Sequence, residues 1–92
     1  MAPVGYSTDK AALLKRLARI GGQVRGVSRM VEDERYCIDV LTQIGAIEAA
    51  LDKVALGLID EHTRHCVLGA EDGERTAKVD ELVAALGRFV GR

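Results

Sequence analysis

Residues 37–66 read CIDVLTQIGAIEAALDKVALGLIDEHTRHC, and this stretch decides the fold. Its apolar residues recur at alternating spacings of four and three, as Val40, Ile44, Ile47, Leu51, Val54 and Leu58. This is the period of a helix with one apolar stripe. No proline and no cluster of capping residues interrupts the pattern, so we expect one long helix over about residues 36–67.

Two further stretches have the same period. The first contains Leu13, Leu17, Ile20, Val24, Val27 and Val31 and predicts a helix over about residues 9–33. The other contains Val79, Leu82, Val83, Leu86 and Val90 and predicts a shorter helix over about residues 76–90, after a loop from Leu68 to Arg75. Residues 1–8 show no apolar period, and we expect a mobile tail there. The fold class is therefore all-α, a single domain over residues 1–92 with two long antiparallel helices and a short third.

Composition supports helix packing and assembly. Aromatic residues make up only 3% of the 92 residues, so Leu, Ile, Val and Ala must build the core. A chain of this length is near the lower limit for a self-sufficient core, and we expect it to oligomerise. The N-terminus lacks the features of a secretion signal, and no apolar run approaches the roughly 20 residues of a bilayer span. We expect a soluble cytoplasmic protein with reduced thiols and no membrane partner.

The charge is spread unevenly along the chain. Residues 1–30 carry six basic side chains against Asp9 alone, whereas residues 31–92 carry seven basic against thirteen acidic, and the net charge is −1. This asymmetry indicates that one face meets an anion. Gly21, Gly22 and Gly26 lie in the same basic region. They either permit close helix contact or let the helix bend or approach a phosphate backbone.

A candidate metal site comprises Cys37, His62 and Cys66. His62 and Cys66 are four residues apart, so they share one face of a helix. Cys37 is 25 residues before His62, which corresponds to roughly 38 Å along an unbroken helix. Either the helix folds back, at Gly45 or Gly57, or an antiparallel second chain supplies the other ligands. The apolar stripe favours the second arrangement, which creates two equivalent sites per dimer.

The donor set indicates the ion. Two thiolates and one imidazole suit three-coordinate copper(I), whereas structural zinc normally requires a fourth donor and is the second choice. Glu61 or Glu81 can accept a hydrogen bond from the second ring nitrogen of His62, and the Tyr36 hydroxyl can join that network. Equally, Glu81 can be solvated and Tyr36 can be a packing residue. No base-activated nucleophile or carboxylate pair stands out, so we do not expect an enzyme.

The chain resembles the CsoR/RcnR family of metal-sensing transcriptional repressors from Lys10 to Arg92. The segments that carry the resemblance are Lys15-Arg16-Leu17, Arg19-Ile20-Gly21-Gly22-Gln23-Val24-Arg25-Gly26, Tyr36-Cys37-Ile38-Asp39-Val40-Leu41-Thr42-Gln43-Ile44 and Glu61-His62-Thr63-Arg64-His65-Cys66. The set of Cys, His and Cys resembles the copper-responsive branch.

The resemblance implies a dimeric four-helix bundle that assembles into a tetramer and holds copper(I) between Cys37 of one subunit and His62 and Cys66 of its partner. It implies that the apo protein binds operator DNA and is released by copper, with Tyr36 and Glu81 coupling the two events. It also implies operator contacts by Arg16 and Lys53, with Gln23 and the basic residues Lys15, Arg19 and Arg25 close by. Alternatives are a sulfur-responsive, redox-responsive or other-metal repressor of the same family, or a helical copper buffer that never meets DNA.

Overall fold

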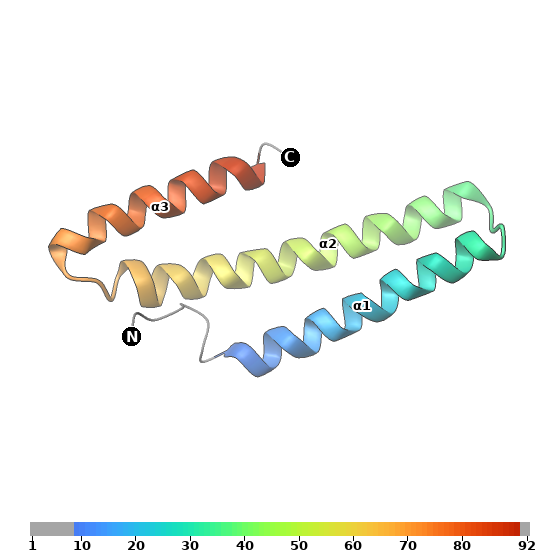
Figure 1. Cartoon of the computed structure of the whole chain (residues 1–92), viewed down its shortest axis with the longest axis horizontal. Coiled ribbons are helices and arrows are strands. Elements are labelled where there is room, and N and C mark those ends of the chain that lie inside the picture. Colours follow the sequence, from blue (N-terminus) through green and yellow to red (C-terminus); the bar gives the residue numbers. More distant parts are fainter. Residues whose placement is uncertain (1–8, 91–92) are drawn as a thin grey trace. The chain divides into compact units, whose positions relative to one another are not determined.

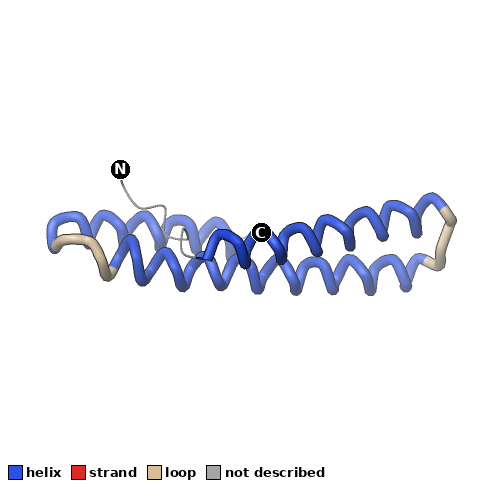
Figure 2. Tube along the Cα trace, turned by 90° about the horizontal axis from the view of Figure 1, so that it is seen from below, coloured by secondary structure: helices blue, strands red, loops and turns tan. Residues whose placement is uncertain are grey.

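Three helices account for most of the computed structural model, which describes residues 9–90. Helix α1 spans Lys10–Glu32, α2 spans Cys37–His62 and continues into a π-helical turn, η2, at Thr63–Val67, and α3 spans Asp72–Val90. Only helices and their short connections occur among the described residues (Figure 2). The mobile tail expected at residues 1–8 lies outside them. The chain divides into two compact units, one ending at Gly57 and the other beginning at Leu58.

The first unit is an antiparallel pair made by α1 and α2 as far as Gly57 (Figure 1). Leu13 and Ile20 of α1 and Val54 of α2 are buried between the two helices. A Cβ atom on Gly57 would lie 4.0 Å from Leu13 Cδ2, so the helices are in contact at this level. The two long helices and their antiparallel order therefore agree with the sequence prediction.

The turn between α1 and α2 is closed by two backbone hydrogen bonds. Arg35 N–H donates to Met30 O at 2.9 Å, and Glu34 N–H donates to Val31 O at 3.1 Å. These are the two bonds of a Schellman cap, which places the residue after the C-cap, Asp33, in the left-handed region. That residue is Glu34, with φ of 54°, at a position where glycine is usual.

Much of the predicted apolar stripe remains exposed in the single subunit. Leu17, Val24 and Val31 of α1 are between 42% and 61% exposed, and Ile44 and Leu51 of α2 are 37% and 41% exposed. The stripe on each helix is therefore only partly covered by the other helix. An apolar surface of this extent is typical of an interaction face.

The second unit contains the end of α2, η2 and α3, and α3 packs on η2. The predicted start of the third helix near Thr76 is wrong, because α3 begins four residues earlier at Asp72. The backbone N–H groups of Glu74 and Arg75 already donate to Glu71 O, at 2.9 and 2.8 Å. Asp72 and Glu74 lie in the first helical turn, where acidic side chains are favoured, and Gly73 is helical rather than part of the loop.

No helix among residues 9–90 combines the length and apolar character needed to cross a bilayer.

We predict that Glu34→Gly stabilises the protein. Glycine removes the left-handed backbone cost of roughly 1–2 kcal/mol. It also loses more conformational entropy on folding, which costs about 0.5–1 kcal/mol. The free energy of unfolding should therefore rise by about 0.5–1 kcal/mol. Urea denaturation at fixed protein concentration measures it. Asp33→Gly is the matched control, because Asp33 has φ of −83° and glycine there should destabilise. Equal effects of the two substitutions would contradict the prediction.

Candidate metal centre and basic groove

Cys37 is the first residue of α2 and is exposed. The helix begins there because Val40 N–H donates to Tyr36 O at 3.2 Å, which starts the helical hydrogen bonding. Tyr36 is 70% exposed, so its ring is not part of the core of this subunit. Both side chains are therefore available to a second molecule.

His62 and Cys66 lie at the other end of α2. His62 is the last residue of the helix and is half-buried, while Cys66 lies on η2 and is buried. The predicted helix continues as far as residue 67, but its last five residues have π-helical winding, in which Leu68 N–H donates to Thr63 O at 2.9 Å. Short π-helical segments are found frequently at functional sites.

The three sulfur and nitrogen donors do not meet within one chain. Helix α2 runs unbroken through Gly45 and Gly57, so a fold-back at either glycine is excluded. Its two ends are roughly 38 Å apart by the rise of an α-helix. In agreement, residues 9–90 contain no group of three His, Cys, Asp or Glu side chains that could hold a metal ion.

Cys37 and His62 nevertheless lie on the same side of α2. Steps of four and three residues lead from one to the other through Leu41, Ile44, Glu48, Leu51, Ala55 and Leu58. We call this line of residues the α2 seam; Leu41, Ile44 and Leu51 on it are 55%, 37% and 41% exposed. An antiparallel second copy of α2 packed along the seam would bring each Cys37 opposite the His62 of the other chain.

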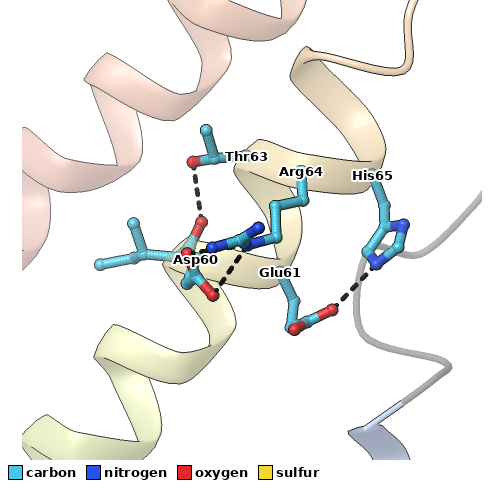
Figure 3. A network of polar contacts seen from close by, with 6 residues as sticks. Asp60, Glu61, Thr63, Arg64 and His65 are labelled. Atoms are coloured by element: carbon cyan, nitrogen blue, oxygen red, sulfur yellow. Dashed lines mark hydrogen bonds and ion pairs between the residues drawn. The ribbon is translucent and has the colours of Figure 1, made fainter.

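The carboxylates expected beside His62 have different surroundings. Glu61 Oε2 lies 2.9 Å from His65 Nε2, in a network at the end of α2 (Figure 3). Glu81 is on α3 and is exposed. The His65 contact was missed by the sequence analysis, although its spacing of four residues is a signal for a side-chain pair on a helix.

Gly69 allows the chain to close tightly behind Cys66. A Cβ atom at this position would lie 2.9 Å from His65 O, 3.6 Å from His65 C and 3.7 Å from Arg64 O. The first distance is shorter than a side-chain carbon tolerates, and the clashing atom is backbone. Glycine is therefore required where the chain leaves η2.

A basic groove lies on the first unit, between α1 and α2. It has a volume of about 750 Å³ and is lined by Arg16, Arg19, Ile20, Gln23, Ala46, Ala49, Ala50, Lys53 and Leu56. Four of the six residues predicted to contact or lie near DNA thus share one surface; Lys15 and Arg25 are exposed but do not line it. The three alanines that line the groove were not predicted, although the spacing of Ala46, Ala49 and Ala50 indicates one helix face.

Helical geometry separates the groove from the α2 seam. Residues two positions apart on a helix point in directions about 200° apart. Leu51 on the seam and Lys53 on the groove are such a pair. The two surfaces therefore lie on opposite edges of α2.

The glycines of α1 do not interrupt the helix. Cβ atoms on Gly21 and Gly22 would be 3.5 and 3.7 Å from the Arg25 guanidinium, and one on Gly26 would be 3.9 Å from that of Arg29. Their nearest neighbours are arginine side chains of the same helix. These are ordinary contact distances, so within the described residues no second helix approaches the three glycines closely enough to require them.

Comparison with known proteins identifies the class to which this fold and donor set belong. The family described as "Metal-sensitive transcriptional repressor" matches residues 9–88. The chain belongs to this family, whose members regulate transcription and are not enzymes.

Individual relatives cover almost the whole chain. The copper-sensing transcriptional repressor RicR of Mycobacterium tuberculosis is 52% identical over 94% of this chain and 93% of its own length. CsoR of Bacillus subtilis, also a copper-sensing repressor, is 44% identical over 90% of this chain and 83% of its own. The crystal structure of CsoR with Cu(I) from Geobacillus thermodenitrificans superposes with a TM-score of 0.88 at 45% identity, over 98% of this chain and 94% of that one. The predicted all-α, three-helix fold and the family are confirmed.

We predict that Gly69→Ala weakens metal binding by displacing Cys66. The added methyl group must push against the His65 carbonyl, at a cost of about 1–3 kcal/mol. Gly73→Ala is the matched control, because a Cβ there meets nothing within 4 Å and alanine in a helix gains roughly 1 kcal/mol. Thermal unfolding and metal titration of both variants measure the effects. Normal metal affinity in Gly69→Ala would show that the tight closure does not position Cys66.

Proposed function

We propose that this protein represses transcription by binding operator DNA in its metal-free form and leaves the DNA when copper(I) binds. The copper(I) site lies between subunits, with Cys37 from one and His62 and Cys66 from the other. The observation that supports this proposal is the unbroken course of α2, which begins at Cys37 and ends at His62. Two of the copper-sensing relatives are 52% and 44% identical to this chain.

The donor chemistry fits copper(I). Two thiolates and one imidazole give three ligands. Copper(I) accepts three ligands, whereas structural zinc normally has four. Cys66 is already buried, whereas Cys37 is exposed at the start of α2. Dimerisation along the α2 seam would enclose the Cys37 thiol as well. The chain's own residues hold and shield the ion; they supply no reaction.

The basic groove is the surface we propose for DNA. Arg16, Arg19 and Lys53 place three cations around it, and none of them has an ion pair with an acidic side chain within residues 9–90. Unneutralised cations attract the phosphate backbone and release its counterions. Gln23 in the same groove adds an amide that can bond to phosphate or to a base edge.

Coupling between the two surfaces requires two states of the assembly. Copper(I) then favours the state with lower affinity for the operator, and by reciprocity DNA lowers copper(I) affinity by the same factor. We assign this coupling to Tyr36, beside Cys37, and to Glu81 on α3. We further propose that two dimers pair into a tetramer on the DNA and that the protein acts where its operator lies, in the cytoplasm.

We predict that two defective variants complement each other. A homodimer of either Cys37→Ser or Cys66→Ser lacks one of the two thiols at each of its two sites. A heterodimer of the two contains one complete site and one site without thiols. After the two variants are unfolded and refolded together, the mixture should therefore regain about a quarter of the wild-type copper(I) capacity with wild-type affinity. Competition against a copper(I) chelator measures it. Absence of recovery, with heterodimers verified by mass spectrometry, would place the ligands within one chain.

We also predict that Arg16→Ala and Lys53→Ala weaken operator binding without changing copper(I) affinity. Each substitution should make the slope of log K against log salt shallower by about 0.9 for every phosphate that the variant leaves unneutralised. Arg88→Ala is the control, since Arg88 lies on α3, outside the groove. A gel-shift titration with the DNA upstream of the protein's own gene, at several salt concentrations, tests this. Unchanged affinity in both groove variants would remove the groove from the DNA interface.

A further inference from the structure

The end of α2 is joined to η2 by three side-chain contacts, each spanning four residues (Figure 3). The contacts are Thr63 Oγ1 to Ile59 O at 2.8 Å, Arg64 Nε to both Asp60 carboxylate oxygens at 3.2 Å, and His65 Nε2 to Glu61 Oε2 at 2.9 Å. The next pair in this register is His62 and Cys66. The two ligands proposed for this end of the helix therefore have the same spacing as these three contacts.

A second imidazole lies beside this pair. His62, His65 and Cys66 are spaced as residues i, i+3 and i+4, which share one side of a helix. His65 and Cys66 also line the same cavity of about 430 Å³ on the second unit. If His65 joined the two thiolates and His62, the set would become two sulfurs and two nitrogens. That is a four-donor set typical of structural zinc and unlike a three-coordinate copper(I) site.

The Glu61 carboxylate holds His65 in its present position. An ionised carboxylate only accepts hydrogen bonds, so His65 Nε2 donates in this 2.9 Å contact. The Glu61 side chain is 16% exposed and that of His65 is 44% exposed, so the carboxylate is the better fixed of the two.

We propose that Glu61 determines metal specificity by withholding His65 as a fourth donor. Glu61 is a positioning residue: it acts through the imidazole of His65 and does not itself bind the metal. The inference rests on the proposed copper(I) site. It adds a reason why a chain with two cysteines and two histidines presents only three donors.

The test compares Glu61→Ala, Glu61→Gln and the double variant Glu61→Ala with His65→Ala, each as the intact oligomer. Glu61→Ala should bind zinc about 10–100-fold more tightly than wild type. The sign is opposite to the loss of similar size that follows when the hydrogen-bond partner of a true ligand is removed, so the direction of the change is diagnostic. X-ray absorption of the zinc form should show one additional nitrogen. Glu61→Gln, whose amide oxygen can still accept from His65, should remain close to wild type. The double variant should show neither the tighter zinc binding nor the additional nitrogen.

Two controls separate a specific effect from a structural one. Asp60→Ala removes the neighbouring exposed contact to Arg64 and should leave zinc affinity unchanged. In the metal-free protein, nitrogen chemical shifts of the His65 ring should change in Glu61→Ala and not in Asp60→Ala. A gain in zinc affinity of equal size in Asp60→Ala would overturn the proposal, because the loss of any of these side-chain contacts would then have the same result.

Two further outcomes would also overturn it. One is an unchanged zinc affinity and nitrogen count in Glu61→Ala while wild type binds copper(I) through Cys37, His62 and Cys66; the proposed function would then survive alone. The other is a loss of copper(I) affinity in the single variant His65→Ala, which would show that His65 already binds the metal through Nδ1. Failure of wild type to bind copper(I) at all would reject the proposed function itself.

Discussion

The length of α2 is the constraint on which the site depends. A continuous helix of 26 residues keeps its two ends roughly 38 Å apart, and the proposed ligands lie at those ends. No side-chain rearrangement can bridge such a distance, so metal binding by this donor set requires a second chain. The same helix offers the means, because the α2 seam, which is apolar except at Glu48, runs directly from one proposed ligand to the other. In the proposed site, dimerisation and metal binding thus depend on the same helix.

Helical geometry also explains how one small subunit can serve two partners. The α2 seam and the basic groove occupy opposite edges of α2, so a second subunit on the seam leaves Arg16 and Lys53 uncovered by that contact. In the proposed arrangement, metal and DNA consequently do not compete for the same surface. Any coupling between them must pass through the helices, as a change in how the subunits pack, and it must act equally in both directions.

The structural elements that the sequence predicted correctly are those with a repeating apolar pattern. Apolar spacing located both long helices within a few residues. The separation of Cys37 and His62 left either a fold-back of the helix or a second chain, and the apolar stripe favoured the second chain. The prediction failed where local chemistry outweighed pattern. Glycine at position 73 was interpreted as a loop, yet the acidic first turn of α3 accommodates it. The π-helical winding of η2 and the left-handed Glu34 had no signal, since both arise from hydrogen bonds that depend on how neighbouring segments close.

Metal choice within this fold must come from local donors and not from the architecture. The family to which the chain belongs is described as metal-sensitive and not by a single ion. A scaffold shared across such a family cannot by itself favour one ion. What differs between ions is the number and kind of ligands they prefer, and a second imidazole would change three donors into the four-donor set typical of structural zinc. A histidine adjacent to a ligand cysteine therefore threatens specificity unless another group occupies it, and in this chain that group is the carboxylate of Glu61, one helical turn earlier.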